Sequence, residues 1–165
     1  MTANDNFKQF CESLAGSWIG RRRGAEHENE IVRSQWQKTL DGNFLRENWL
    51  TTSSGSAPEP TAEAFFKIAA SGPGDFIAVY RSGKIAFGES AFAGDEWRLT
   101  HRWLREPGVA AIRLKFLDAD TYEQEVDEVM PDGTLKPESK SIMKREPVSR
   151  PDHGISGTLS ASQKQ

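Results

Sequence analysis

Seven turn signals divide most of the sequence into short strand-like runs of similar length. Each signal combines residues such as glycine, proline, aspartate and serine, which accept positive φ or preset a turn. They are Asp41-Gly42, Gly72-Pro73-Gly74, Ser82-Gly83, Gly94-Asp95, Pro107-Gly108, Asp118-Ala119-Asp120 and Pro131-Asp132-Gly133. Strands joined by such short turns pair with their neighbours in sequence, and a long antiparallel meander removes its exposed edges by closing into a barrel.

The runs between the turns predict about ten strands. Their expected bounds are 17–23, 30–40, 43–52, 62–70, 76–81, 84–92, 96–104, 109–117, 121–129 and 134–145. Residues 5–15 instead show the periodicity of one helical face. That face carries Phe7, Phe10, Cys11 and Leu14. The sequence therefore predicts an all-β fold, an antiparallel up-and-down β-barrel of about ten strands with a short N-terminal capping helix.

The composition fits a barrel and restricts its partners. Only 36% of the residues are hydrophobic, and a barrel needs one apolar face per strand. The net charge of −3 gives no general attraction to nucleic acid, which is not an expected partner. No run is long enough for a membrane span, and Cys11 has no second cysteine to pair with. We expect a cytoplasmic protein, and the sequence leaves a homodimer open.

The domain boundary is expected near the C-terminal end. Residues 1–146 form one barrel domain with its N-terminal helix, and residues 147–165 form a disordered tail, because their few apolar side chains cannot offset the entropy of ordering. Inside the domain, the connection from Thr52 to Thr61 is the longest, and we expect it to be a mobile rim at the mouth of the barrel.

Side chains alternate along a strand, and we assign the more apolar face of each run to the interior. The inward sets are Leu45, Glu47 and Trp49; Ala64, Phe66 and Ile68; Phe76, Ala78 and Tyr80; Ile85, Phe87, Glu89 and Ala91; Trp97, Leu99, His101 and Trp103; Ala110, Ile112, Leu114 and Phe116; and Tyr122, Gln124 and Val126. The interior so defined is aromatic with a few polar side chains.

Three of those polar side chains are candidates for function. Glu47, Glu89 and His101 each lie between apolar neighbours on their face. A buried carboxylate without a partner costs several kcal/mol, and burial raises its pKa toward the operating pH. Glu47 or Glu89 would then act as a general base, and His101 or Tyr80 as a general acid. The alternatives are that these residues face solvent or form a purely structural pair.

Aromatic side chains form the expected wall of a ligand cavity. The wall residues are Trp49, Phe66, Tyr80, Phe87, Trp103 and Phe116. The alternative is that aromatic side chains simply fill the barrel. No His, Cys, Asp or Glu cluster has metal-ligand spacing, and no haem motif or phosphate-binding loop is present. We therefore expect no metal and no cofactor.

A family resemblance is carried by an N-terminal helix that runs into Leu14-Ala15-Gly16-Ser17-Trp18-Ile19-Gly20, by a strand with Trp36, and by Leu40-Asp41-Gly42-Asn43-Phe44-Leu45. This first third of the chain resembles the bacterial lipocalin-like barrels of the calycin superfamily. The resemblance implies that Gly16-Ser17-Trp18 packs at the closed end of the barrel and that an apolar cavity binds a small hydrophobic molecule. Some relatives hold haem or catalyse cyclisation, isomerisation or decarboxylation.

The resemblance does not extend to a haem site. The nitrobindin branch has a glycine-rich first strand, where Arg21 to Arg23 stand here, and a haem-ligating histidine near the C-terminal end of its barrel. No histidine lies between Trp103 and Arg145. The chain therefore departs from the haem-binding pattern at both places.

Two functions of different classes follow. The first is binding of a small hydrophobic or aromatic ligand in the cavity. The second is a cofactor-free acid/base enzyme, an isomerase, cyclase or hydro-lyase, that acts on a small hydrophobic substrate in the same cavity. A third possibility is an interaction scaffold whose barrel is filled by side chains. The sequence does not decide between an enzyme and a binding protein.

Overall fold

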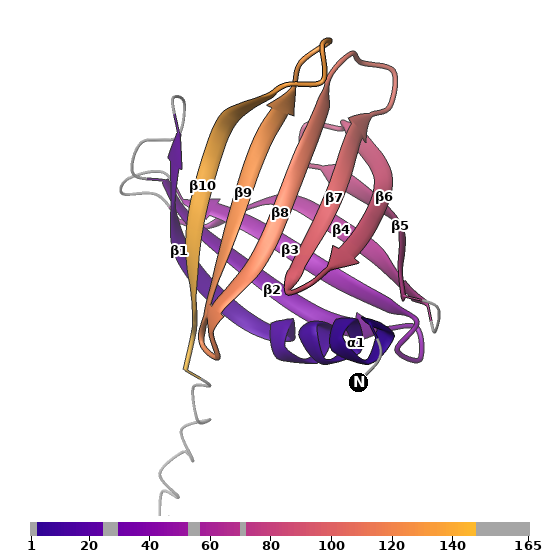
Figure 1. Cartoon of the computed structure of the whole chain (residues 1–165). Helices are drawn as coiled ribbons and strands as arrows, with labels where there is room; N and C mark the ends of the chain where they lie inside the picture. Colours follow the sequence, from indigo (N-terminus) through magenta and orange to yellow (C-terminus); the bar gives the residue numbers. More distant parts are fainter. Residues whose placement is uncertain (1–2, 25–29, 53–56, 70–71, 148–165) are drawn as a thin grey trace, which may run out of the picture.

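The computed structural model describes residues 3–24, 30–52, 57–69 and 72–147. They form one helix and ten strands (Figure 1). The elements are α1 (Ala3–Leu14), β1 (Gly16–Gly24), β2 (Glu30–Thr39), β3 (Phe44–Thr52), β4 (Glu59–Ala69), β5 (Gly72–Tyr80), β6 (Ile85–Ala93), β7 (Glu96–Trp103), β8 (Val109–Asp118), β9 (Thr121–Val129) and β10 (Leu135–Arg145). The predicted helix and all ten predicted strands are confirmed.

The ten strands form a closed antiparallel barrel. Each strand pairs with its neighbours in sequence, and β1 pairs with β10 to close the sheet. Closure removes both edges that an open meander would leave unpaired. The predicted up-and-down barrel is therefore confirmed.

One of the predicted turns is wrong. Gly72-Pro73-Gly74 does not form a turn, because these residues are the first of β5 and pair with the end of β4. The register shifts between Phe66 and Ile68, and Pro73 lies opposite Ile68 beside this bulge. A bulge accommodates a proline, which has no N–H to give to the ladder.

Helix α1 closes one end of the barrel, the lower end in Figure 1. Its apolar face, which carries Phe7, Phe10, Cys11 and Leu14, is buried in the barrel core. The ring of Phe10 makes edge-to-face contacts with the rings of Phe92, Trp97 and Phe116. This half of the interior is packed with buried aromatic side chains.

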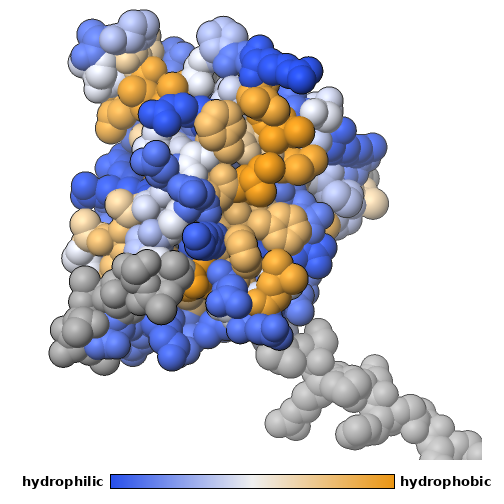
Figure 2. All heavy atoms as spheres, turned by 90° about the vertical axis from the view of Figure 1, so that its right-hand side faces the viewer, coloured by the Kyte–Doolittle hydropathy of each residue, from blue (hydrophilic) through white to orange (hydrophobic). Residues whose placement is uncertain are grey.

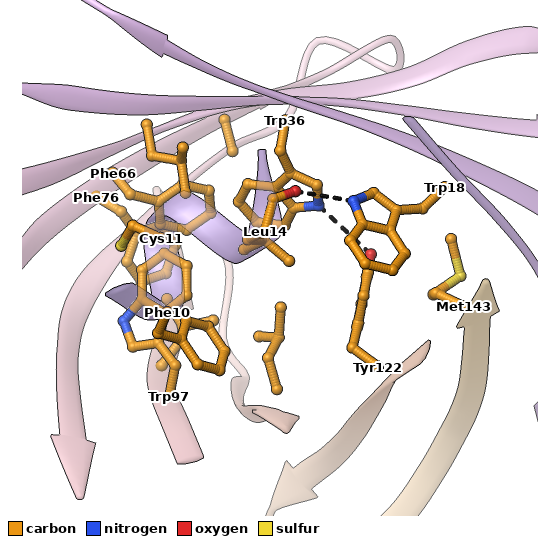
Figure 3. Close-up of a cluster of buried hydrophobic side chains, with 14 of the residues drawn as sticks. Phe10, Cys11, Leu14, Trp18, Trp36, Phe66, Phe76, Trp97, Tyr122 and Met143 are labelled. Carbon is orange, nitrogen blue, oxygen red and sulfur yellow. Dashed lines mark hydrogen bonds between the residues drawn. The ribbon is translucent and has the colours of Figure 1, made fainter. Parts of the chain in front are cut away.

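Trp18 connects the helix to the barrel. It is fully buried, and its indole N–H donates a 2.8 Å hydrogen bond to the Leu14 carbonyl at the end of α1 (Figure 3). The Arg145 guanidinium lies 4.2 Å from the centre of the Trp18 ring. A cation over an indole face stabilises the contact. The expected role of Gly16-Ser17-Trp18 at the closed end is therefore seen in the structure.

Strand β6 presents the opposite face from the one predicted. Phe87 is 43% exposed and Glu89 is also exposed, whereas Gly88 faces the interior. Gly88 is in register with Phe76 on one side and His101 on the other. A Cβ on Gly88 would overlap the Thr100 carbonyl oxygen of β7 and lie 2.8 Å from the Phe76 ring on β5. The two neighbouring strands therefore leave no room for a larger residue at this inward position.

Parts of the chain lie outside the described residues. They include residues 53–56 of the expected rim loop and residues 148–165 of the expected tail. Among the residues that are described, no helix has the length and apolar character to cross a membrane.

Candidate functional site

A cavity of about 250 Å³ lies in the half of the barrel away from α1. Its walls come from strand ends near the loops that follow β1, β3, β5, β7 and β9. Its lining residues are Arg22, Trp36, Glu47, Trp49, Thr61, Ala62, Ala64, Phe66, Phe76, Ala78, Tyr80, Leu99, His101, Trp103, Ala110, Ile112, Leu114, Gln124, Val126, Glu138, Ser139 and Ser141. The barrel is therefore not filled solid by its side chains.

The lining divides into two arcs of the closed sheet. The arc from β4 to β8 supplies mostly apolar and aromatic side chains, such as Phe66, Phe76 and Ile112. The arc from β9 through β10 and β1 to β3 supplies most of the polar ones, including Glu47 and Gln124. A molecule in this cavity would contact apolar side chains on one side and hydrogen-bonding groups on the other.

Glu47 is the buried carboxylate of the polar arc. It is 9% exposed, and the Ser34 hydroxyl donates a 2.7 Å hydrogen bond to its Oε1. Burial raises the pKa of Glu47 to about 7, although the Ser34 hydrogen bond opposes this. A carboxyl group whose pKa lies near the operating pH can both give and take a proton.

Buried hydrogen bonds involving Ser34, Trp36 and Tyr122 lie next to Glu47. The Trp36 indole N–H donates to the Tyr122 hydroxyl at 3.4 Å (Figure 3). Tyr122 also interacts with Ser34, and Ser34 donates to Glu47. An indole N–H can only donate, so Tyr122 is the acceptor from Trp36, whereas the hydroxyl groups of Tyr122 and Ser34 can each donate or accept. Burial raises the pKa of Tyr122, which stays protonated.

Tyr80 and His101 form the polar pair of the other arc. The Tyr80 hydroxyl lies 3.0 Å from His101 Nε2, and the His101 and Trp103 rings are edge-on at 4.6 Å. Burial lowers the pKa of His101 and raises the pKa of Tyr80 to about 12. Both side chains are neutral at neutral pH. His101 Nδ1 is buried without a hydrogen-bond partner among the described residues.

Two further charged side chains line the cavity, and both lie near its mouth. Arg22, near the end of β1, bonds to Ser139 at 3.1 Å and pairs with Glu30 at 3.7 Å. Glu138, near the start of β10, also lines the cavity. The Arg22 guanidinium is therefore held by its own neighbours on β2 and β10.

The structure brings together most of the residues nominated from the sequence. Those that line the cavity are Glu47, Trp49, Phe66, Tyr80, His101 and Trp103. Three others do not line it. Phe87 and Glu89 lie on the outer face of β6, so their inward assignment is wrong. Phe116 lies with Phe10 and Trp18 in the packed end below the cavity.

Ser34, Ser139 and Ser141 were not found from the sequence. All three are buried, Ser34 on β2 and Ser139 and Ser141 on β10. In β2 the residues Val32, Ser34 and Trp36 alternate with polar neighbours. The same period-two rule would have placed Ser34 inside.

Comparison with known proteins supports the fold. No protein-family model matches the chain, and no curated protein matches it in sequence. The solved structure of Rv2717c from M. tuberculosis is similar, with a TM-score of 0.59 and 16% identity over 84% of this chain and 96% of that one. The S-type phycobiliprotein lyase CPES from Guillardia theta has a TM-score of 0.57 and 15% identity over 86% and 93%. The chain shares the fold of these two proteins, a lipocalin-like barrel.

Proposed function

We propose that this lipocalin-like barrel binds a small hydrophobic or aromatic molecule in its cavity. The observation that carries the proposal is the cavity of about 250 Å³ with an apolar wall and a few inward polar groups. Its volume corresponds to about eight water molecules, which suits a ligand of one or two rings. Apolar walls with a small number of placed polar groups are typical of ligand pockets.

Aromatic side chains support a flat ligand. Tyr80 and Trp103 pack with their ring centres 4.9 Å apart at the mouth side of the cavity. Phe66 and Phe76 pack at 5.3 Å deeper inside. Ring faces and edges of this kind favour stacking with an aromatic ligand.

The first experiment compares the native and denaturing masses of the purified protein. An excess mass that is lost on denaturation identifies a carried ligand. In parallel, 2-acetylnaphthalene is titrated against the protein, and tryptophan fluorescence is followed. Saturable quenching is the expected result.

Two variants show whether the probe enters the cavity. Ala78→Phe adds a ring to the lining of the cavity, and Ala91→Phe adds the same ring on the exposed face of β6. Ala78→Phe is expected to abolish quenching, and Ala91→Phe to leave it unchanged. Equal quenching by both variants would rule out binding in the cavity.

A second candidate function is cofactor-free acid/base catalysis in the same cavity. It is supported by Glu47, whose pKa is raised to about 7, and by the Tyr80–His101 pair. One structural neighbour is a phycobiliprotein lyase by name, so the barrel fold occurs in a protein that is named as an enzyme. Glu47 as general base would remove a proton from carbon beside a carbonyl group, and Tyr80 or His101 would supply a proton to the oxygen.

This second function has a direct assay. The methyl protons of 2-acetylnaphthalene exchange for deuterium in heavy water when a base removes them, and NMR follows the loss of signal. Catalysed exchange that Glu47→Gln abolishes and Glu89→Gln preserves supports an enzyme. If the bound probe exchanges its methyl protons no faster than it does in buffer, the catalytic function is excluded and the binding function remains.

A further inference from the structure

The charges around the cavity restrict the kind of ligand it accepts, and this inference rests on the proposed binding function. Glu47 takes part in no ion pair among the described residues, and Arg22 is engaged by Glu30 and Ser139. The inner lining therefore offers no free cation to an anionic ligand. An ionised Glu47 would be buried without a counter-charge, which is unfavourable.

Glu47 lines the cavity, and its one side-chain hydrogen bond among the described residues is the bond from Ser34 to Oε1. When the carboxyl group is protonated, it also has an O–H to donate. This O–H can donate to an acceptor on a ligand in the cavity.

We propose that the ligand is an uncharged planar aromatic molecule with a hydrogen-bond acceptor such as a carbonyl at one edge, and that protonated Glu47 donates to this acceptor. The apolar arc of β4 to β8 contacts the ring faces, and the polar arc holds the edge. The acceptor on the ligand takes the hydrogen bond that the protonated carboxyl group donates. An amide or ketone supplies a neutral acceptor. A carboxylate can also accept a hydrogen bond, but its charge would be buried without a free cation beside it.

The other titratable groups near the cavity do not obscure the effect of Glu47. They are Arg22 on β1, Glu30 on β2, Tyr80 on β5, His101 on β7, Tyr122 on β9 and Glu138 on β10. Burial lowers the pKa of His101 and raises those of Tyr80 and Tyr122. Between neutral and mildly alkaline pH, Glu47 is therefore the buried cavity group that changes charge.

Three probes that share the naphthalene ring test the ligand class. They are 2-acetylnaphthalene, which is neutral, 2-naphthoic acid, which is anionic, and 1-(2-naphthyl)ethylamine, which is cationic. We expect the neutral ketone to bind about tenfold more tightly than either charged probe, the worth of one hydrogen bond. Tighter binding of the acid or the amine overturns the inference and leaves the proposed function standing. Failure of all three to bind removes the proposed function itself.

The pH dependence tests the role of Glu47. Affinity of the wild type for the ketone is expected to fall at least about tenfold between about pH 6 and about pH 9, because the donor proton is lost. Glu47→Gln keeps a donor at all pH values, so it should bind about tenfold more tightly than the wild type at about pH 9. Glu47→Leu has no donor and should bind about tenfold more weakly at about pH 6. A flat wild-type profile would contradict the inference.

A second inference comes from the outer surface and is independent of the cavity. Four exposed apolar side chains gather on and beside the outer faces of β5 and β6, namely Ile77, Val79, Phe87 and Leu104, and we call them the β5–β6 patch. Each is 43–46% exposed. Figure 2, which looks onto this side of the barrel, shows apolar atoms gathered there. Ile77 and Phe87 are in register on neighbouring strands. An apolar patch across paired strands is a common feature of interaction sites.

The charges at the two ends of the patch have opposite sign. Asp75 and Glu89 are in register at the end nearer α1. Arg102 lies beside Phe87, and Arg105 follows Leu104 toward the mouth. None of these four side chains forms an ion pair with another described residue. A two-fold axis in the plane of the patch and perpendicular to the strands would lay the acidic end of one copy on the basic end of the other.

We infer that a second copy of this chain covers the β5–β6 patch in such a two-fold dimer. Sedimentation velocity on the full chain is expected to show a dimer that dissociates on dilution. Phe87→Asp should give a monomer with an unchanged circular dichroism spectrum, whereas Leu117→Asp, at an exposed leucine on β8 outside the patch, should keep the dimer. A wild type that is monomeric at every concentration, or a Phe87→Asp variant that still dimerises, overturns this inference.

Discussion

Substitution of Glu47 by glutamine is expected to stabilise the protein at alkaline pH. The carboxyl group has a pKa of 4.5 in its ordinary state and of about 7 when buried in the folded barrel. Between these values the folded chain holds a proton that the unfolded chain has released. Stability is therefore lost as the pH rises from about 4.5 through about 7, and the loss is complete above that range. Glutamine does not titrate and avoids this loss.

The size of the effect follows from the two pKa values. One pKa unit is worth about 1.4 kcal/mol, so the difference between 4.5 and about 7 corresponds to about 3 kcal/mol. Glu47→Gln should exceed the wild type in free energy of unfolding by about 3 kcal/mol at about pH 8 and by less than about 1 kcal/mol at about pH 5. The amide can also accept the Ser34 hydrogen bond, so the buried network is preserved.

The assay is urea unfolding followed by tryptophan fluorescence at a series of pH values. Glu89→Gln is the matched control, because Glu89 is exposed on the outer face of β6. This control should follow the wild type at every pH. A Glu47→Gln variant that is less stable than the wild type at about pH 8 would refute the reasoning, since it would mean that the carboxylate is stabilised by partners in the folded state.

Two further predictions concern packing. Gly88→Ala should destabilise the fold by at least about 1–3 kcal/mol, because its Cβ would overlap the Thr100 carbonyl oxygen of β7 and lie 2.8 Å from the Phe76 ring. Gly74→Ala, whose nearest neighbour is the Lys67 side chain at 3.4 Å, should cost less. Urea unfolding compares the two variants, and equal losses would contradict the packing argument. Cys11 is fully buried, and burial raises the pKa of its thiol to about 12. It should resist a thiol reagent in the native protein and react after unfolding, so rapid native labelling would count against this placement.

Much of the fold could be predicted because its signals are local. Turn residues act through their own φ and ψ, so six of the seven turn signals mark actual turns or loops, and ten strands follow. The exception is Gly72-Pro73-Gly74, which forms the start of β5 because Gly72 and Pro73 pair with Ala69 and Ile68 at the end of β4. The helix was visible from its period, and its apolar face is buried as expected.

The site was only partly predictable, because it depends on which residues meet across strands. Glu47 and His101 were found from their positions between apolar neighbours. Glu89 shows the same pattern and lies outside. The local pattern is identical in the two cases. Only the neighbouring strands, with Phe76 and His101 beside Gly88, decide which face of β6 turns inward.

The sequence by itself determined the strand order, the closure of the barrel and the helix at one end, because turns, alternation and helical period act over a few residues. The tertiary structure decided the size of the cavity, the division of its lining into an apolar and a polar arc, and the raised pKa of Glu47. These depend on volumes and on donors that come from distant strands, as Trp36 and Tyr122 do. Neither the space between side chains nor their desolvation is encoded in any one strand.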